Sequence, residues 1–267
     1  MAQKIQLVVF DWAGTTTDFG SLAPVHVFDE TFSEYGLHFT KQEISAPMGM
    51  EKREHIRTML STERGTALWQ AARGKAWTEE DVDEVYERFE QNLRRVVAEY
   101  SKVIPGVAET VARLREMGIQ IGSTTGYTSE IMRYVLPVAQ AGGYDPDCIV
   151  TPDVVGYSRP APFMVYECMR QTGIWPAKCV VKVGDTVVDM QEGKTAGAWS
   201  IGVVKGSNLM GLSEEEYHSA APKVLQEKAE AVREIYRKAG ADLVIGSILE
   251  LPAAIELLNA RMEAQEA

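Results

Sequence analysis

Short apolar runs alternate with longer segments of helical periodicity along most of the chain. Residues 7–10 (LVVF) are too few and too rich in β-branched side chains for a helix, so they predict a buried strand. After residue 100, similar runs separated by helical segments occur at 119–125, 148–153, 178–185, 199–206 and 241–247. This alternation predicts the α/β class, with a Rossmann-like, mostly parallel sheet and helices on both faces.

The region from about residue 20 to residue 99 has apolar positions at helical spacing and no strand-like run. Its clearest segment is 78–100, which Thr78 is expected to cap at the N-terminal end. We therefore predict that residues 21–99 form a helical cap domain, inserted into an α/β core domain of residues 1–20 and 100–267. The segment 213–240 of that core is predicted to be helical throughout.

Carboxylates follow two of the predicted strands. Asp11 comes directly after the first strand, and Asp185 follows the strand of 178–184, with Asp189 four residues farther on. Open α/β sheets bind their ligands at the carboxyl ends of the strands, and carboxylate oxygens suit Mg²⁺, so a divalent-metal site is expected. Alternatively, Asp11 only opens a turn, and Asp189 is an acidic residue favoured in the first turn of a helix.

An anion site is predicted near the strand of 119–125. Thr125 and Gly126 offer a hydroxyl and backbone N–H groups where that strand leads into a helix. Thr124 is an alternative contact, although Thr125 precedes the glycine and fits better. Arg159 can hold phosphoryl oxygens bidentately, unless it is an ordinary surface residue of its loop. Lys182, within a predicted strand, is a competing cation that we expect at an outer or edge position.

Composition narrows the class of partner. The chain has 267 residues, 45% of them hydrophobic, and a formal net charge of −11, which argues against a nucleic-acid partner and a basic membrane-binding patch. Cys148, Cys168 and Cys179 have no zinc-site spacing and are expected to be buried thiols. No signal peptide precedes residue 7 and no apolar run has membrane-spanning length, so a cytoplasmic protein is expected.

Taken together, these motifs resemble the haloacid dehalogenase superfamily. The four ordered motifs are carried by Asp11 with Thr15, Thr125, Arg159, and Gly184-Asp185 with Asp189. The resemblance implies that Asp11 attacks phosphorus and that Arg159 replaces the superfamily's usual phosphate-binding lysine. It also implies Mg²⁺ as the cofactor, held by Asp11, Asp185 and the backbone carbonyl of Ala13, with Asp189 binding directly or through water.

One departure from the usual motif points to a narrower family. Ala13 stands where most phosphatases of this superfamily have a second Asp that acts as general acid and base. Together with Lys52 in the segment MGMEKREH, this resembles the phosphonoacetaldehyde hydrolases, or phosphonatases, which use a Schiff-base lysine. The resemblance implies a small-molecule phosphonate substrate that is cleaved to acetaldehyde and phosphate, and a homodimer.

Lys52 taken alone would be a solvated helix residue. A role as nucleophile requires a lowered pKa, which a helix N-terminus, a nearby metal and partial desolvation would favour. His55 shares a helical face with Lys52 and is a candidate proton shuttle. Met48 is expected to pack beside the imine, and Tyr127 to approach it from the core side.

Two other functions are compatible with these residues. A capped Mg²⁺-dependent phosphatase or phosphomutase acting on a small phosphate ester is the first, although Ala13 argues against it. The second is a non-catalytic phosphate-binding or regulatory protein, which the retention of Asp11 and Asp185 makes less favourable. The apolar segment after Phe19 is expected either to pair caps in a dimer or to belong to the cap core.

Overall fold

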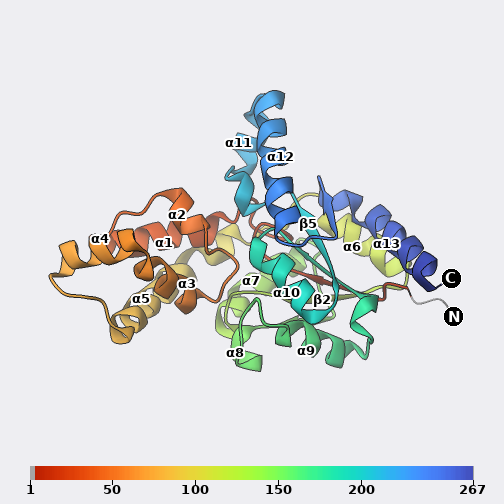
Figure 1. Ribbon diagram of the computed structural model, residues 1–267, viewed down its shortest axis with the longest axis horizontal. Helices are drawn as coiled ribbons and strands as arrows, with labels where there is room; N and C mark the ends of the chain where they lie inside the picture. Colours follow the sequence, from red (N-terminus) through yellow and green to blue (C-terminus); the bar gives the residue numbers. More distant parts are fainter. Residues whose placement is uncertain (1–3, 267) are drawn as a thin grey trace.

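The computed structural model of the protein describes residues 4–266 and has one six-stranded sheet at its centre (Figure 1). All neighbouring strands are parallel, in the order β3-β2-β1-β4-β5-β6. The strands are β1 Leu7–Phe10, β2 Gln120–Thr124, β3 Cys148–Val150, β4 Val180–Gly184, β5 Trp199–Val203 and β6 Leu243–Ile245. The predicted α/β class with a parallel sheet is therefore confirmed.

The strand order places a topological switch point at β1. The chain passes from β1 to β2 and β3 on one side, and then returns to β4 on the other side. At the end of β1, Phe10 is in register with Ser123 of β2 and Val183 of β4. Because ligands bind outside the carboxyl ends of strands at such a point, the residues that follow β1, β2 and β4 are positioned to form one site.

Helices cover both faces of the sheet. Along β1, Val8 and Phe10 belong to one buried apolar cluster, whereas Leu7 and Val9 belong to another. Both faces of the strand are buried, as expected for a parallel strand between two helical layers. The helices after residue 106 are α6 Val107–Glu116, α7 Ser129–Ala141, α8 Pro152–Val155, α9 Phe163–Thr172, α10 Val187–Ala196, α11 Glu214–Ser219, α12 Pro222–Lys238 and α13 Leu251–Glu266. Short 3₁₀ turns lie at Ala177–Cys179, Asn208–Met210 and Ile248–Glu250.

A separate group of helices lies between β1 and α6 in the sequence and to one side of the sheet in Figure 1. It consists of α1 Leu22–Glu34, α2 Lys41–Ser45, α3 Lys52–Ser61, α4 Glu63–Arg73 and α5 Glu79–Tyr100. The Phe28 ring of α1 stacks on the Phe89 ring of α5 at 4.2 Å between centroids. Thr78 caps α5 as predicted, accepting a hydrogen bond from the Asp81 backbone N–H. The domain boundaries at residues 21 and 99 stay a prediction.

Two other predictions can be compared with the structure. The segment 213–240 is not one helix, because α11 ends at Ser219 and α12 begins at Pro222. Proline lacks an N–H group and is tolerated in the first turn of a helix, so it separates the two. The three cysteines are buried, as expected. Within residues 4–266, no helix is long and apolar enough to cross a membrane.

Candidate active site

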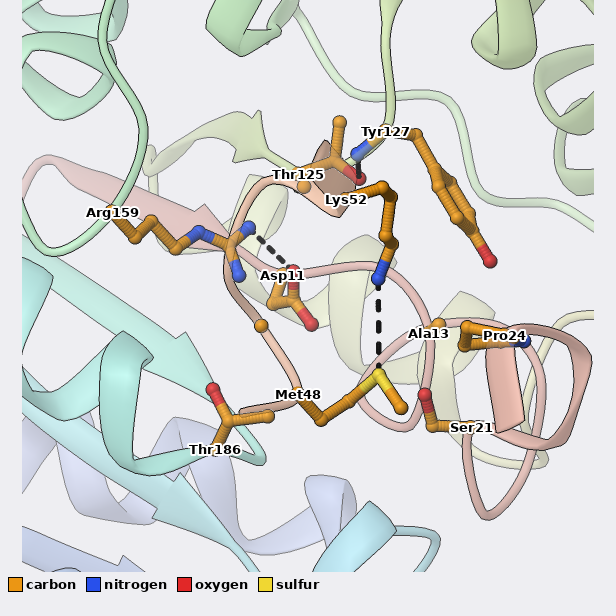
Figure 2. A pocket seen from close by; sticks show the side chains of 12 residues that line it. Asp11, Ala13, Ser21, Pro24, Met48, Lys52, Thr125, Tyr127, Arg159 and Thr186 are labelled. Atoms are coloured by element: carbon orange, nitrogen blue, oxygen red, sulfur yellow. Dashed lines mark hydrogen bonds and ion pairs between the residues drawn. The ribbon is translucent and has the colours of Figure 1, made fainter. Parts of the chain in front are cut away.

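A pocket opens where the carboxyl edge of the sheet meets the α1–α5 group (Figure 2). Its lining includes every residue that the sequence predicted to contact substrate or phosphate, except His55. The lining residues are Asp11, Ala13, Ser21, Pro24, Met48, Gly49, Lys52, Thr125, Gly126, Tyr127, Arg159 and Thr186. The pocket therefore combines the predicted nucleophile, the predicted imine-forming lysine and the predicted anion-binding groups.

Asp11 is held at the end of β1 by the backbone. Its N–H donates to the Val183 carbonyl at 2.9 Å, which continues the pairing of β1 with β4. Asp11 is 6% exposed as a residue, and its Oδ1 accepts from Arg159 Nη2 at 2.5 Å. The chain then turns through Gly14, at φ 87°, where an added Cβ would lie 2.2 Å from Asp185 Oδ2. Glycine at this position lets the backbone after Asp11 approach the second carboxylate.

Asp185 lies in a cluster that fits a metal ion. Asp11, Asp185 and Asp189 each offer one oxygen atom, and these atoms lie within 4.8 Å of one another. Asp185 is fully buried, and it accepts hydrogen bonds from the Asn208 N–H at 2.8 Å and from Thr15 Oγ1 at 3.2 Å. Burial raises the pKa of Asp185 well above its usual value, and the charges of Asp11 and Asp189 add to this. A bound cation would relieve the repulsion.

Asp189 has a different environment. It completes a capping box at the start of α10, where its Oδ2 accepts from the Thr186 N–H at 3.1 Å and from Thr186 Oγ1 at 2.5 Å. Its Oδ1 forms ion pairs with Arg159 and Lys182, at 2.9 and 3.0 Å. Burial works to raise the pKa of Asp189, but these cations outweigh burial and lower it. Asp189 Oδ1 is therefore paired with two cations, whereas the oxygens of Asp185 accept only from neutral donors.

The balance of buried charge also fits a divalent cation. Two cationic side chains, Arg159 and Lys182, are buried with four carboxylates, which belong to Asp11, Asp185, Asp189 and Glu192. When all four carboxylates are ionised they outnumber these two cations, and the amine of Lys52, buried in the same pocket, offsets part of the excess when it is protonated. Uncompensated charge is costly inside a protein, and a divalent cation would reduce the remaining excess.

The two threonines at the end of β2 have different surroundings. Thr125 lines the pocket, where its Oγ1 accepts from the Tyr127 N–H at 3.1 Å. Thr124 points away into a buried polar network, where its Oγ1 accepts from Lys182 Nζ at 2.8 Å. The geometry therefore favours Thr125 as the anion contact. At Gly126, an added Cβ would lie 2.6 Å from the Met50 carbonyl, so this backbone passes close to the loop before α3.

Lys52 is the first residue of α3 and is buried at 7% exposure, so the solvated alternative is wrong. In Figure 2 its side chain enters the pocket near Asp11. Nζ lies 3.8 Å from Met48 Sδ, and 5.3 and 5.7 Å from the ring centroids of Tyr127 and Phe28. Burial lowers the pKa of Lys52 to about 8, the charge of Arg159 acts in the same direction, and the carboxylate of Asp11 opposes it. A substantial fraction of the amine is therefore neutral at mildly alkaline pH.

His55 does not line the pocket, although it lies on the same helix as Lys52. Its ring is fully buried, 4.0 Å from the Phe28 ring centroid, and Nε2 lies 2.9 Å from the Ile44 carbonyl. Since a carbonyl only accepts, Nε2 carries the proton of the neutral ring. Burial, followed by the charge of Lys52, lowers the pKa of His55 well below its usual value. The predicted proton shuttle has no support from this placement and stays a prediction.

The sequence reasoning missed two residues that line the pocket, Ser21 and Pro24. Ser21 and Pro24 reach the pocket because they begin α1, directly after the turn that Asp18 stabilises. Asp18 Oδ1 and Oδ2 accept from the Leu22 and Ala23 N–H groups, both at 2.9 Å, and burial raises the pKa of Asp18 to about 7. An Asp shortly before a helical pattern was the available signal for this turn.

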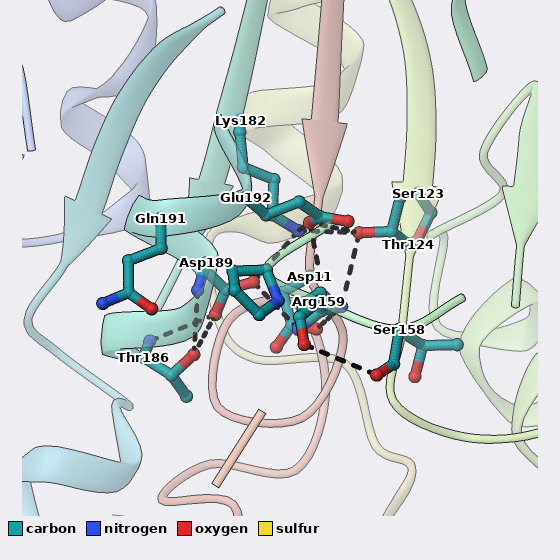
Figure 3. A network of polar contacts seen from close by, with 12 residues as sticks. Asp11, Ser123, Thr124, Ser158, Arg159, Lys182, Thr186, Asp189, Gln191 and Glu192 are labelled. Atoms are coloured by element: carbon teal, nitrogen blue, oxygen red, sulfur yellow. Dashed lines mark hydrogen bonds and ion pairs between the residues drawn. The ribbon is translucent and has the colours of Figure 1, made fainter. Parts of the chain in front are cut away.

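Lys182 was predicted at an edge or an outer position, and that prediction is wrong. It lies in β4, an interior strand, and its side chain is fully buried. Its amine reaches Asp189, Thr124 and the buried carboxylate of Glu192, as shown in Figure 3. A single lysine within an apolar run gives no indication of such partners, which come from other elements.

Comparisons with known proteins identify relatives that match nearly the whole chain. Residues 5–197 match the family model described as haloacid dehalogenase-like hydrolase. The chain is 46% identical to a phosphonoacetaldehyde hydrolase of Bacillus cytotoxicus, over 96% of this chain and 97% of that protein. A phosphonoacetaldehyde hydrolase of Parabacteroides distasonis is 45% identical, over 98% and 100%. A solved structure of a phosphonoacetaldehyde hydrolase-like protein from Oleispira antarctica has a TM-score of 0.95 and 36% identity, over 98% and 95%.

Proposed function

This chain belongs to the haloacid dehalogenase-like hydrolases and, among them, to the phosphonoacetaldehyde hydrolases, and we propose that it cleaves phosphonoacetaldehyde to acetaldehyde and phosphate through an imine on Lys52. The observation that carries the mechanism is a buried lysine in the same pocket as Asp11. Ala13, in that pocket, supplies no acid for a leaving group.

The first step is imine formation. The neutral amine of Lys52 attacks the aldehyde carbon, and loss of water gives a protonated imine. A pKa of about 8 makes the neutral amine accessible without strong base. The rings of Tyr127 and Phe28, near Nζ, favour a cation at this position.

The second step breaks the carbon–phosphorus bond. An oxygen of Asp11 attacks phosphorus and forms an aspartyl-phosphate, while the bonding electron pair moves into the iminium and gives an enamine. Proton donation alone stabilises such a carbanionic leaving group poorly, which explains why a lysine serves here instead of a second Asp. Arg159, 2.5 Å from Asp11 Oδ1, is placed to bind the phosphoryl oxygens as charge develops on them.

The last steps release both products. Protonation of the enamine carbon gives the imine of acetaldehyde, and water hydrolyses that imine to acetaldehyde and free Lys52. A second water hydrolyses the aspartyl-phosphate, which restores Asp11 and releases phosphate. Thr125 and the backbone at Gly126 bind the phosphoryl group through these steps.

Mg²⁺ is the proposed cofactor. Asp11, Asp185 and the Ala13 backbone carbonyl would hold it, with Asp189 binding through water. When bound, it offsets the negative charge of the carboxylates and of the phosphonate. The buried cluster of Asp11, Asp185 and Asp189, with one oxygen of each within 4.8 Å of the others, supports this assignment.

The α1–α5 group is proposed to act as a cap that moves relative to the core. The pocket around Lys52 must open to admit the substrate and then close to exclude water. A homodimer formed through the segment after Phe19, and a cytoplasmic location, also stay predictions.

Release of phosphate and acetaldehyde from phosphonoacetaldehyde, in the presence of Mg²⁺, tests the proposed reaction. If a small alkyl phosphate were hydrolysed faster, and if that activity survived Lys52→Ala, the alternative of a capped phosphatase would be correct.

A further inference from the structure

A buried network of charged side chains connects Arg159 to Lys182, Asp189 and Glu192 (Figure 3). Two of its members, Lys182 of β4 and Glu192 of α10, are 0% exposed and do not line the pocket. They therefore act on the reaction only through residues that do line it. Arg159 is such a residue.

Each nitrogen of the Arg159 guanidinium faces a different carboxylate. Nη2 donates to Asp11 Oδ1 at 2.5 Å, Nη1 lies 2.9 Å from Asp189 Oδ1, and Nε lies 3.3 Å from Glu192 Oε2. Only Nη2 forms hydrogen bonds, to Asp11 and Thr124, whereas Nε has no hydrogen-bond partner among residues 4–266 and its contact with Glu192 is an ion pair. Because a guanidinium is planar, charged groups on three of its nitrogens restrict both its position and its rotation. Glu192 attracts Nε, which shares one edge of the guanidinium with Nη2, and Thr124 Oγ1 contacts both Nη2 and Glu192.

Lys182 holds the same two carboxylates from the other side. Its Nζ lies 3.0 Å from Asp189 Oδ1 and 3.1 Å from Glu192 Oε2. Thr124 joins the network, since its Oγ1 donates to Glu192 Oε2 at 3.0 Å and accepts from Lys182 and from Arg159 Nη2. The two cations and the two carboxylates thus alternate around a closed arrangement.

The packing of α10 enables this arrangement. An added Cβ at Gly193 would lie 2.3 Å from Ser200 Oγ and 2.9 Å from Lys182 Cβ. The glycine lets α10 approach β4 and β5 closely enough for the neighbouring Glu192 to reach Lys182. Burying such charges is costly, and apolar residues of similar volume are often equally stable, so stability alone does not account for them.

We propose that Glu192, together with Lys182, is a positioning residue that holds the Arg159 guanidinium with Nη2 directed at Asp11. This role rests on the proposed function insofar as Arg159 binds the phosphoryl group. Without the charge of Glu192, Arg159 and Lys182 repel each other with only Asp189 between them. Arg159 is then displaced from the geometry required for phosphoryl transfer, whereas Lys52 keeps the burial that is the main cause of its lowered pKa and still forms the imine.

The test is Glu192→Gln, which keeps the shape of the side chain and removes its charge. We expect kcat for phosphonoacetaldehyde to fall about 10- to 100-fold, since displacements of about 1 Å cost this much. Borohydride trapping of the imine at saturating substrate is expected to stay at the wild-type level. The affinity for inorganic phosphate in the presence of Mg²⁺, measured by calorimetry, is expected to fall by a similar factor. Lys194→Met is the control, because Lys194 lies on the same helix and pairs with Asp242 at the surface.

A second variant distinguishes loss of the positioning role from misfolding. Lys182→Met/Glu192→Met replaces the buried pair with apolar side chains of similar length, and its melting temperature is expected to stay near the wild-type value. This double variant should still have a low kcat and a weak affinity for inorganic phosphate. A folded variant with wild-type kcat and phosphate affinity would overturn the positioning role, and so would a loss of imine trapping in parallel with kcat. If wild-type protein did not cleave phosphonoacetaldehyde, the proposed function would fail, while the phosphate affinities would still decide the role of Glu192.

Discussion

Lys52 and Asp11 line the same pocket, although they come from different parts of the fold. Lys52 is the first residue of α3 in the α1–α5 group, and Asp11 directly follows strand β1 of the sheet. The carboxylate of Asp11 favours the protonated amine, but burial of Lys52 outweighs this attraction and the amine has a lowered pKa. One pocket therefore holds a nucleophile for carbon and another for phosphorus. Cleavage of a carbon–phosphorus bond next to an aldehyde requires both.

Replacing the lysine should abolish the reaction. We expect Lys52→Ala to lower kcat for phosphonoacetaldehyde by about 10⁴-fold, or roughly 5 kcal/mol, because no electron sink remains for the leaving carbon. Lys41→Ala is the control, since Lys41 is exposed and does not line the pocket. Phosphate release measured under saturating substrate gives the result. A Lys52→Ala variant of nearly normal rate would exclude the imine mechanism.

The pH dependence should follow the Lys52 amine. Only the neutral amine attacks the aldehyde, and its pKa is lowered from 10.5 to about 8. The rate of imine formation should therefore be constant above pH 8 and fall by about tenfold for each pH unit below it. A lysine of ordinary pKa would instead give a rate that still rises beyond pH 9. Borohydride trapping at a series of pH values measures this directly.

Gly14 should be essential for the carboxylate cluster. A Cβ at this position would lie 2.2 Å from Asp185 Oδ2, so Gly14→Ala should displace Asp185 and weaken Mg²⁺ binding by at least about tenfold. The matched control is Gly74→Ala. Gly74 also has a positive φ, of 71°, but nothing lies within 4 Å of an added Cβ. It should therefore lose only about 1 kcal/mol of stability. Equal Mg²⁺ affinity in both variants would contradict this account of the turn.

Removing the metal should lower both activity and stability. Because a cation would relieve the buried excess of carboxylates, saturating Mg²⁺ should raise the free energy of unfolding, by about 2.7 kcal/mol at 100 times its Kd. Chelation should reverse the effect and abolish turnover. In Asp185→Asn the stabilisation by Mg²⁺ should largely disappear, while the metal-free variant should melt no lower than the metal-free wild type, since it has less repulsion. Thermal unfolding with and without Mg²⁺ measures both effects.

The sequence predicted those parts of the site that depend on local pattern. Asp11 and Asp185 were found because each follows a short apolar strand, and parallel strands bring their carboxyl ends to one edge. The burial of Lys182 could not be predicted, because its partners Asp189 and Glu192 come from a different element. His55 was correctly placed near Lys52 along α3, but a carbonyl of α2 holds its ring away from the pocket.

The imine on Lys52 is the central claim, and trapping it is the most direct test. The protein is mixed with Mg²⁺ and phosphonoacetaldehyde, reduced with borohydride and mapped by peptide mass. We predict a reduced two-carbon adduct on the peptide that contains Lys52, together with loss of activity. No adduct on any lysine, with the substrate left intact, would contradict the mechanism and the assignment of this pocket to carbon–phosphorus cleavage.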